Sequence, residues 1–499
     1  MTVYTNQLAE QYVLEIISRS RTTKGRCRNL LSKDFPSEAP KSLAIVISGI
    51  CDYLESATKH IFSNIDWEDS GTEKAEENFN IFKVTDFIVK QIASHIQYID
   101  GAQTQKLPWS FIRPIEKLAK TFLSNNVILL VPQWDYNYSI LTSNLYDYYL
   151  KLLSPYEAYD LGKKVTEVLT PLGRSFYVVF FPSIERKNIL LHCALGHEIG
   201  HLKAREYLTD REQGVLQAIR DKIIPIVEAE IKEKYSDVPP LMQQSIYQRL
   251  AQSKIERATH AWRRGLEELL SDTVGTILFG PALLFSIFEI TNQDLTGLDK
   301  IPGTDNNFYP SWRMRLRNIL EALRTFGFYP LPSDEGLEPV KDVINAVNQR
   351  FKVIEDIVKD TKDKTSISED SILKIAYDEI ECDVSKARDY YKNDSEKLFG
   401  KTFNLYKDLP DLINRISFEI PPNACEKSTD DRRPSKIIEI LNAAWFSRLA
   451  WEDRLFSRDG QFNDKLCEKR DIMNRLTLKA LEYSDIEVDF LNALSNGKE

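Results

Sequence analysis

The sequence of 499 residues contains few histidines and few cysteines, only six of each. The cysteines are scattered without a C-x-x-C pair, which is typical of reduced thiols and not of a disulfide framework or a cysteine metal site. No apolar run is long and uncharged enough to predict a membrane span. The chain also lacks a Gly-rich phosphate loop, a G-x-S-x-G nucleophile motif, an RNA-binding signature and an internal repeat.

An excess of basic residues is also missing. The formal net charge is −9, and such a field repels nucleic acid and anionic membrane surfaces, so no nucleic-acid partner is expected. Hydrophobic residues make up 42% and charged residues 28%, which is ordinary for a globular protein and argues against disorder. The first residues lack the basic and apolar regions of a signal or transit peptide, so the expected location is the cytoplasm.

The length predicts more than one domain, because a single core usually serves about 100–200 residues. Helical periodicity dominates residues 1–118 and residues 331–499, which we interpret as an N-terminal and a C-terminal helical region. Residues 119–330 form the predicted central core. Within that core, a charged segment at about residues 203–257 is typical of a helical insertion or arm. The predicted fold class is mainly α (α+β), with a small β-sheet.

Three features of the central core bear on its local structure. Two short apolar and β-branched runs, Val127–Val131 and Ser175–Phe181, predict buried strands. A helix is expected to begin near Ile184 and to continue past residue 200. The most apolar stretch, Leu269–Ile290, carries two acidic residues and is interrupted by Gly280 and Pro281, so it predicts a buried helix with a break rather than a membrane span.

One pentapeptide carries a chemical pattern: His197-Glu198-Ile199-Gly200-His201, an H-E-x-x-H motif. On a helix with about 3.6 residues per turn, positions i and i+4 share one face, so His197 and His201 can bind one zinc ion. Glu198 then lies beside the metal, where it can act as a general base rather than as a ligand. The alternative is a solvated helix face that carries two histidines without a metal.

A catalytic zinc usually has three protein ligands, so a further ligand is expected. The downstream segment Gly265–Asp272 contains an E-x-x-x-D pattern, with Glu268 and Asp272 on one helix face. H-E-x-x-H followed by E-x-x-x-D resembles the gluzincin metallopeptidases, including the minigluzincins. The resemblance implies that Glu268 is the third zinc ligand and that Asp272 hydrogen-bonds His197 and fixes its tautomer. Glu267 is the alternative to Glu268, but no Asp follows it at the same spacing.

A third segment, Tyr309–Leu316, reads Y-P-S-x-x-x-R-L and resembles the H-P-S-x-x-x-R segment of minigluzincin-like peptidases. It departs from that pattern at the first position, where Tyr replaces His. A phenol can donate a hydrogen bond to a developing oxyanion, and Arg315 matches the charge partner of the pattern. Alternatively, this segment only begins and braces a helix. His260, two turns before Glu268, either lines the cleft or lies on the helix surface.

These patterns predict a zinc metallopeptidase that hydrolyses a peptide or protein substrate, with a zincin-like core at residues 119–330. The resemblance further implies a strand edge beside the metal helix, to which an extended substrate can add. One alternative is a helical interaction or scaffold protein with a structural or catalytically retired zinc site. Another is a metallohydrolase that acts on a non-peptide bond. The helical flanks are suited to a protein partner.

Overall fold

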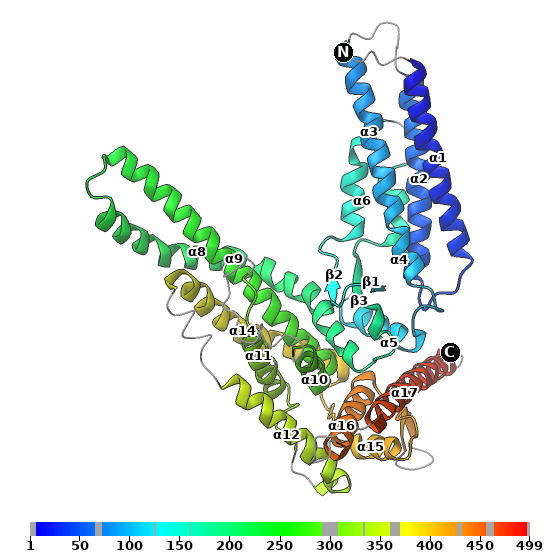
Figure 1. The fold of residues 1–499 in the computed structure, drawn as a ribbon, viewed down its shortest axis with the longest axis vertical. Coiled ribbons are helices and arrows are strands. Elements are labelled where there is room, and N and C mark those ends of the chain that lie inside the picture. Colours follow the sequence, from blue (N-terminus) through cyan, green and yellow to red (C-terminus); the bar gives the residue numbers. More distant parts are fainter. Residues whose placement is uncertain are drawn as a thin grey trace. The chain divides into compact units, whose positions relative to one another are not determined.

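The computed structural model describes most of the chain: residues 6–64, 72–123, 126–159, 161–291, 308–332, 335–359, 370–426, 432–455 and 464–496. The predicted mainly helical fold with a small sheet is confirmed (Figure 1). The chain forms two compact units, Met1–Arg186 and Lys187–Glu499. The boundary between them lies inside the predicted core of residues 119–330. The three-stranded sheet belongs to the first unit and the H-E-x-x-H helix to the second.

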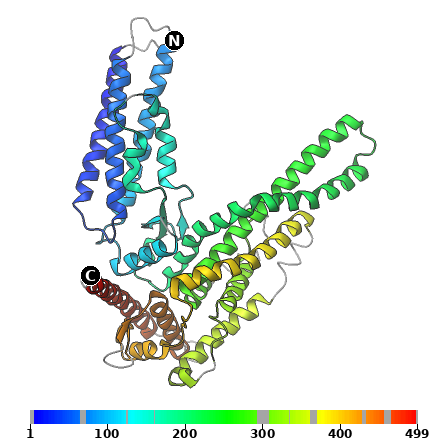
Figure 2. The same ribbon diagram turned by 180° about the vertical axis from the view of Figure 1, so that it is seen from behind.

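Three helices dominate the first unit: α1 (Asn6–Leu31), α2 (Ala39–Ser63) and α3 (Thr72–Ser94). They pack side by side, as Figures 1 and 2 both show. The apolar residues of α2 recur at helical spacing, so one face of this helix enters the core. The fully buried residues of that face include Leu43, Ile47, Ile50 and Leu54.

The sheet of the first unit has the strand order β1-β3-β2. Strands β1 (Val127–Gln133) and β3 (Phe176–Pro182) are parallel, and β2 (Ser139–Ile140) pairs antiparallel with β3. Both predicted strands are therefore confirmed. The shorter helices of this unit are α4 (Ile96–Gly101), α5 (Trp109–Phe122), α6 (Leu145–Leu153) and α7 (Val165–Leu169).

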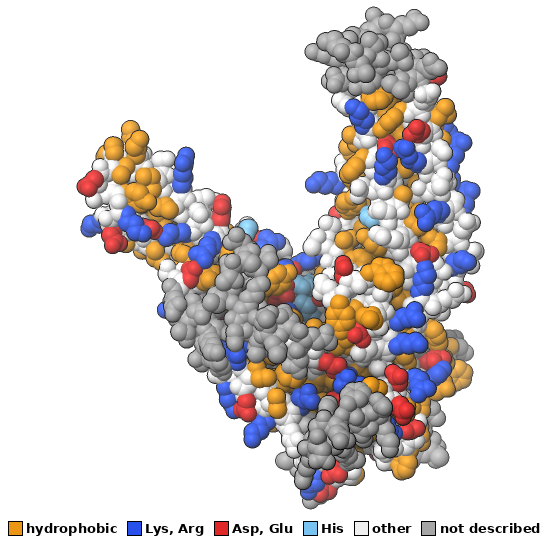
Figure 3. Space-filling view, in the orientation of Figure 1, with side chains coloured by type: hydrophobic (Ala, Val, Ile, Leu, Met, Phe, Trp, Pro, Cys, Tyr) orange, Lys and Arg blue, Asp and Glu red, His pale blue; other side chains and the backbone are white. Residues whose placement is uncertain are grey.

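The second unit is built on a long helical hairpin of α8 (Leu195–Lys234) and α9 (Pro240–Phe279), each of 40 residues. The segment predicted as an insertion, residues 203–257, forms the outer part of this hairpin. Figure 3 shows charged side chains of both signs along it and hydrophobic side chains at its far end, where Leu241 and Met242 are exposed.

The predicted start of the metal helix near Ile184 is wrong, because α8 begins at Leu195 after a 3₁₀ turn at Leu191–Ala194. Tertiary hydrogen bonds engage the carbonyls just before α8. The indole of Trp445 donates to the carbonyl of Leu190 (3.1 Å), and the hydroxyl of Ser286 donates to that of Leu191 (2.5 Å). These side chains come from distant parts of the sequence, so local periodicity does not reveal them.

The predicted break in the apolar stretch is confirmed. Helix α9 ends before Gly280, which has a positive φ of 57°, and α10 (Pro281–Thr291) begins directly after it. Asn442 of α16 (Ile437–Leu455) joins the two helices: its amide donates to the carbonyl of Phe279 (2.9 Å) and accepts from the N–H of Ala282 (2.8 Å). Within the described part of the chain, we find no helix with the length and apolarity needed to cross a bilayer.

Helices α11 (Trp312–Thr325) and α14 (Ser371–Phe399) of the second unit pack against α9. Asp383 of α14 joins three helices, because it accepts hydrogen bonds from Arg211 of α8 (2.8 Å) and Trp262 of α9 (3.2 Å). Further elements of this unit are α12 (Lys341–Val358), α15 (Leu409–Ser417), α17 (Asp464–Asn496), β4 (Ala424–Glu426) and β5 (Arg432–Pro434).

Glycines allow α8 and α9 to approach closely at the H-E-x-x-H motif. A Cβ atom at Gly200 would lie 2.5 Å from the carbonyl oxygen of Ser271, and one at Gly196 would lie 2.7 Å from the ring of Phe279. Both distances are shorter than non-bonded carbon contacts allow. The helix that carries the two histidines therefore requires small residues on its inner face.

We expect Gly200→Ala to lower the free energy of unfolding by about 1–3 kcal/mol, because the backbone of α9 must move away from the new methyl group. Gly214→Ala on the same helix is the matched control, since nothing lies within 4 Å of its Cβ position. It should raise stability by about 0.5–1 kcal/mol through helix propensity. Urea unfolding of both variants measures the difference, and equal effects would contradict the close approach.

Candidate metal centre

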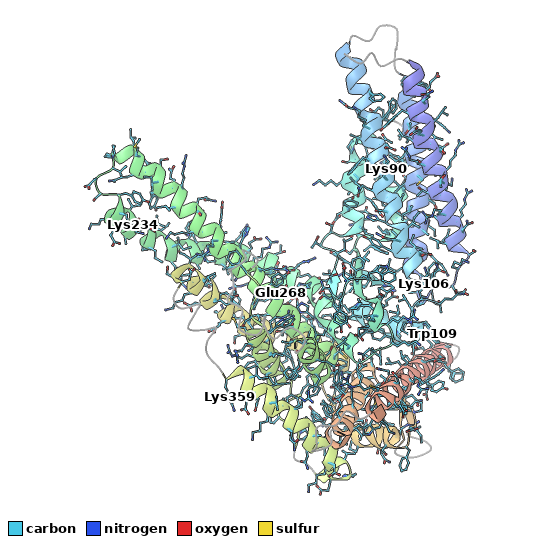
Figure 4. All side chains as sticks on the ribbon, viewed as in Figure 1. Lys90, Lys106, Trp109, Lys234, Glu268 and Lys359 are labelled. Carbon is cyan, nitrogen blue, oxygen red and sulfur yellow. The ribbon has the colours of Figure 1, made fainter. Side chains whose placement is uncertain are left out.

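The side chains of His197, Glu198 and His201 form a buried group on the first two turns of α8. One ligand atom from each lies within 4.8 Å of the other two. The i, i+4 spacing thus brings the two imidazoles together, as the sequence predicts. Figure 4 labels Glu268 on the neighbouring helix α9, which runs beside α8 at this level.

Each imidazole has a carboxylate at its Nδ1 atom. The Nδ1 of His197 lies 2.8 Å from a carboxylate oxygen of Asp272, and the Nδ1 of His201 lies 3.1 Å from one of Glu267. A neutral imidazole that donates its Nδ1 proton keeps the lone pair on Nε2 for a metal. The two carboxylates therefore favour the tautomer that presents Nε2 atoms as ligands.

Glu268 faces both Nε2 atoms. One of its oxygens lies 3.3 Å from the Nε2 of His197, and the other lies 3.9 Å from the Nε2 of His201. The side chain of Glu268 is almost fully buried. The group whose ligand atoms could hold one metal ion consists of His197, Glu198 and His201, and Glu268 lies beside it. Imidazole nitrogens with a carboxylate oxygen are a donor set that fits zinc.

Arg315 reaches this group from α11. Its guanidinium forms a bidentate pair with Asp272 at 2.7 and 2.9 Å, and it lies 3.7 Å from Glu268. One of its nitrogens is 3.0 and 3.3 Å from the two ring nitrogens of His197, so the cation contacts the imidazole as well. Ser311 is the N-cap of α11, and its hydroxyl accepts a hydrogen bond from the N–H of Met314 (3.2 Å).

Charge pairing sets the ionisation of the buried groups. Burial acts to raise the pKa of Glu268 and that of Asp272, but His197 and Arg315 outweigh it and hold both pKa values below their usual range. For His197, burial and Arg315 act to lower the pKa. Asp272 and Glu268 outweigh them and raise this pKa to about 9. Without a metal, His197 is therefore protonated at neutral pH.

We expect zinc binding at pH 7 to release about one proton from His197. An imidazole must be neutral to bind a metal, and the pKa of His197 in the metal-free protein is about 9. The apparent zinc affinity should accordingly rise with pH up to about 9. Titration calorimetry in buffers of different ionisation enthalpy counts the released protons. A binding enthalpy that is independent of the buffer would contradict this expectation.

A second group of side chains lies at the edge of the cluster. The Nε of Arg205 donates to Glu267 (2.9 Å), and Arg264 lies 3.3 Å from Glu268 and 3.6 Å from Glu267. Arg264 also stacks over the ring of Tyr309, 4.1 Å from its centroid, and donates a hydrogen bond to its hydroxyl. Arg264 thus contacts both Tyr309 and the carboxylates of the cluster. The side chain of Tyr309 is 39% exposed.

The structure brings most of the predicted site residues to one place. Glu268, Asp272 and Arg315 contact His197 directly, whereas His260 is exposed on α9 and has no contact with the cluster among the described residues. Sequence analysis treated Glu267 only as an alternative to Glu268 and missed the arginines of the edge. A signal for them exists, because Arg205 lies one turn after His201 and Arg264 one turn before Glu268.

We expect Glu267→Ala to weaken zinc binding by about 10–100-fold, because His201 loses the acceptor that holds its Nδ1 proton. Glu267→Gln keeps an acceptor oxygen in nearly the same place, so its zinc affinity should decrease much less. A competition titration with a chelator of known affinity measures both variants. Equal zinc affinity in Glu267→Ala and the wild type would show that Glu267 does not orient His201.

Comparisons with known proteins provide no relative for this chain. No protein-family model, curated protein or solved structure matches it. The buried His-Glu-His group is compatible with an H-E-x-x-H metal site, and it is the observation from which a function has to be inferred.

Proposed function

We propose that the protein is a zinc-dependent metallopeptidase with a gluzincin-like site, in which His197, His201 and Glu268 hold the metal. The arrangement of the two imidazoles carries this proposal: both Nδ1 atoms have carboxylate partners, and both Nε2 atoms are directed toward Glu268. When bound, zinc would polarise a peptide carbonyl and lower the pKa of a water molecule toward about 7.

The choice between the two nearby carboxylates follows from their partners. Glu268 is fixed by Arg315 and Arg264 and faces both Nε2 atoms. Glu198 has no hydrogen bond or ion pair among the described residues, although it is buried beside the histidines. In the gluzincin pattern that the two motifs resemble, the glutamate of H-E-x-x-H is the base and not a ligand. We therefore assign Glu268 as the ligand and Glu198 as the general base.

In the proposed reaction, Glu198 accepts a proton from the attacking water and later delivers it to the leaving amine. Asp272, held by Arg315, keeps His197 in the required tautomer. The hydroxyl of Tyr309 accepts a hydrogen bond from Arg264, so its own proton remains to be donated to the carbonyl oxygen of a substrate. These roles use side chains from α8, α9 and α11 and from the segment just before α11.

Cleavage of an unbiased peptide library by the zinc-loaded full chain tests this function. We expect products that appear with zinc and disappear when a chelator has removed it. Stoichiometric zinc binding without any cleavage would contradict the peptidase and favour a structural or retired site. Hydrolysis of ester or other non-peptide substrates alone would favour the metallohydrolase alternative.

A further inference from the structure

Arg264 is the arginine of the cluster that is best placed to meet a ligand. Its side chain is 33% exposed, whereas that of Arg315 is 8% exposed and forms a bidentate pair with Asp272. Arg205 is similarly accessible, but its Nε already donates to Glu267 at 2.9 Å. The contacts of Arg264 with carboxylates are longer, 3.3 and 3.6 Å, so they are the weaker ones.

The ring of Tyr309 orients this cation. The guanidinium lies 4.1 Å from the ring centroid and also donates a hydrogen bond to the hydroxyl, so the cation is held against the aromatic face. Stacked arginines of this kind keep an edge with N–H donors that matches the two oxygens of a carboxylate. The 39% exposure of Tyr309 leaves this stacked pair accessible from solvent.

The charge balance of the loaded cluster favours an anion. Four carboxylates (Glu198, Glu267, Glu268 and Asp272) and three guanidinium groups (Arg205, Arg264 and Arg315) contribute a formal charge of −1 when both imidazoles are neutral. A divalent cation changes this sum to +1. It also neutralises the Glu268 carboxylate that Arg264 contacts in the metal-free protein. Binding of zinc therefore weakens the attraction between Glu268 and Arg264, whose other carboxylate contact, with Glu267, is the long one at 3.6 Å, and this favours a further anionic partner.

We infer that Arg264, stacked on Tyr309, binds a carboxylate of the substrate, so that the site prefers peptides that present a carboxylate to this arginine. This inference rests on the proposed metallopeptidase function. The carboxylate can come from an Asp or Glu side chain or from a peptide C-terminus, since both offer the same pair of oxygens. Arg264 is thus a specificity residue of the proposed reaction.

Binding of small carboxylates tests the inference without turnover. The probes are succinate and glutarate, each compared with the monocarboxylate of the same length, butyrate or pentanoate, on the zinc-loaded full chain. We expect the dicarboxylate of at least one pair to bind about tenfold or more tightly than its partner, because it adds a charge-assisted bidentate contact. The preference should be lost in Arg264→Ala and Arg264→Gln.

The matched control is Arg263→Ala. Arg263 precedes Arg264 on α9 but pairs with Glu212 at the surface (3.0 Å), so its loss should leave the preference unchanged. An equal affinity for the mono- and dicarboxylates in the wild type, or a preference that survives Arg264→Gln, would overturn the inference while leaving the zinc site intact. A wild-type chain that binds no zinc would overturn both this inference and the proposed function.

Peptide substrates then separate the two carboxylate sources. If a C-terminus is bound, amidation of the peptide should lower kcat/KM about tenfold or more, and a Glu→Gln change near the cleaved bond should have little effect. If a side chain is bound, the two effects should be reversed. In either case the decrease in kcat/KM should disappear in Arg264→Gln. Cleavage that is insensitive both to amidation and to the Glu→Gln change in the peptide would contradict the preference for a carboxylate.

Discussion

Glu198→Gln is expected to reduce the rate of peptide cleavage by about 10²–10⁴-fold, because an amide cannot accept the proton of the attacking water. The shape of the side chain is almost unchanged, and the proposed ligands His197, His201 and Glu268 remain. Zinc affinity should therefore stay within a few-fold of the wild type. Steady-state cleavage and zinc titration on the same preparation measure the two effects together.

Glu206→Gln is the matched control for this prediction. Glu206 is also on α8, but its side chain is exposed and pairs with Lys203 at 2.9 Å. We expect normal cleavage from this variant. Full activity of Glu198→Gln would rule out Glu198 as the base, and loss of zinc from it would move Glu198 into the ligand set.

Arg315→Met is expected to lower the free energy of unfolding of the metal-free protein by about 3–5 kcal/mol, the usual cost of leaving a buried charge without its partner. Asp272 is fully buried and loses its bidentate cation, so that His197 alone remains beside it, and Glu268 loses the same cation. The packing of the methionine stem replaces only the apolar part of the arginine. Chemical denaturation in the presence of a chelator measures the change.

Arg324→Met on the same helix provides the comparison. Arg324 pairs with Glu321 and Glu355 near the surface, so its loss should cost about 1 kcal/mol or less. Similar destabilisation by the two substitutions would show that Arg315 does not compensate buried charge. A more stable Arg315→Met variant would show that the cost of burying the ion pair exceeds its attraction.

Much of the site is local in sequence, and this part could be predicted. His197 and His201, like Glu268 and Asp272, are separated by one helical turn, so the period of the helix alone places each pair on one face. The resemblance to gluzincins implied that the second pair faces the first, with Glu268 beside the two histidines and Asp272 beside His197. The contact of Asp272 with the Nδ1 of His197 agrees with that expectation.

The remaining parts depend on tertiary packing that no local pattern encodes. The partner of His201 is Glu267, 66 residues away, and it faces the second imidazole because α8 and α9 pack closely along their glycines. Just before α8, the carbonyls of Leu190 and Leu191 accept hydrogen bonds from Trp445 and Ser286. Periodicity predicts a longer helix there because it contains no information about these distant donors.

The central claim is that Glu268, and not Glu198, completes a zinc site with the two histidines. Zinc quantification and affinity on the wild type, Glu268→Ala and Glu198→Ala test it most directly. We expect one zinc ion per chain in the wild type and near-normal binding in Glu198→Ala. Glu268→Ala should lose more affinity than the about 10–100-fold typical of residues that only orient a ligand. Absence of zinc from the wild type, or the opposite ranking of the two variants, would contradict the account.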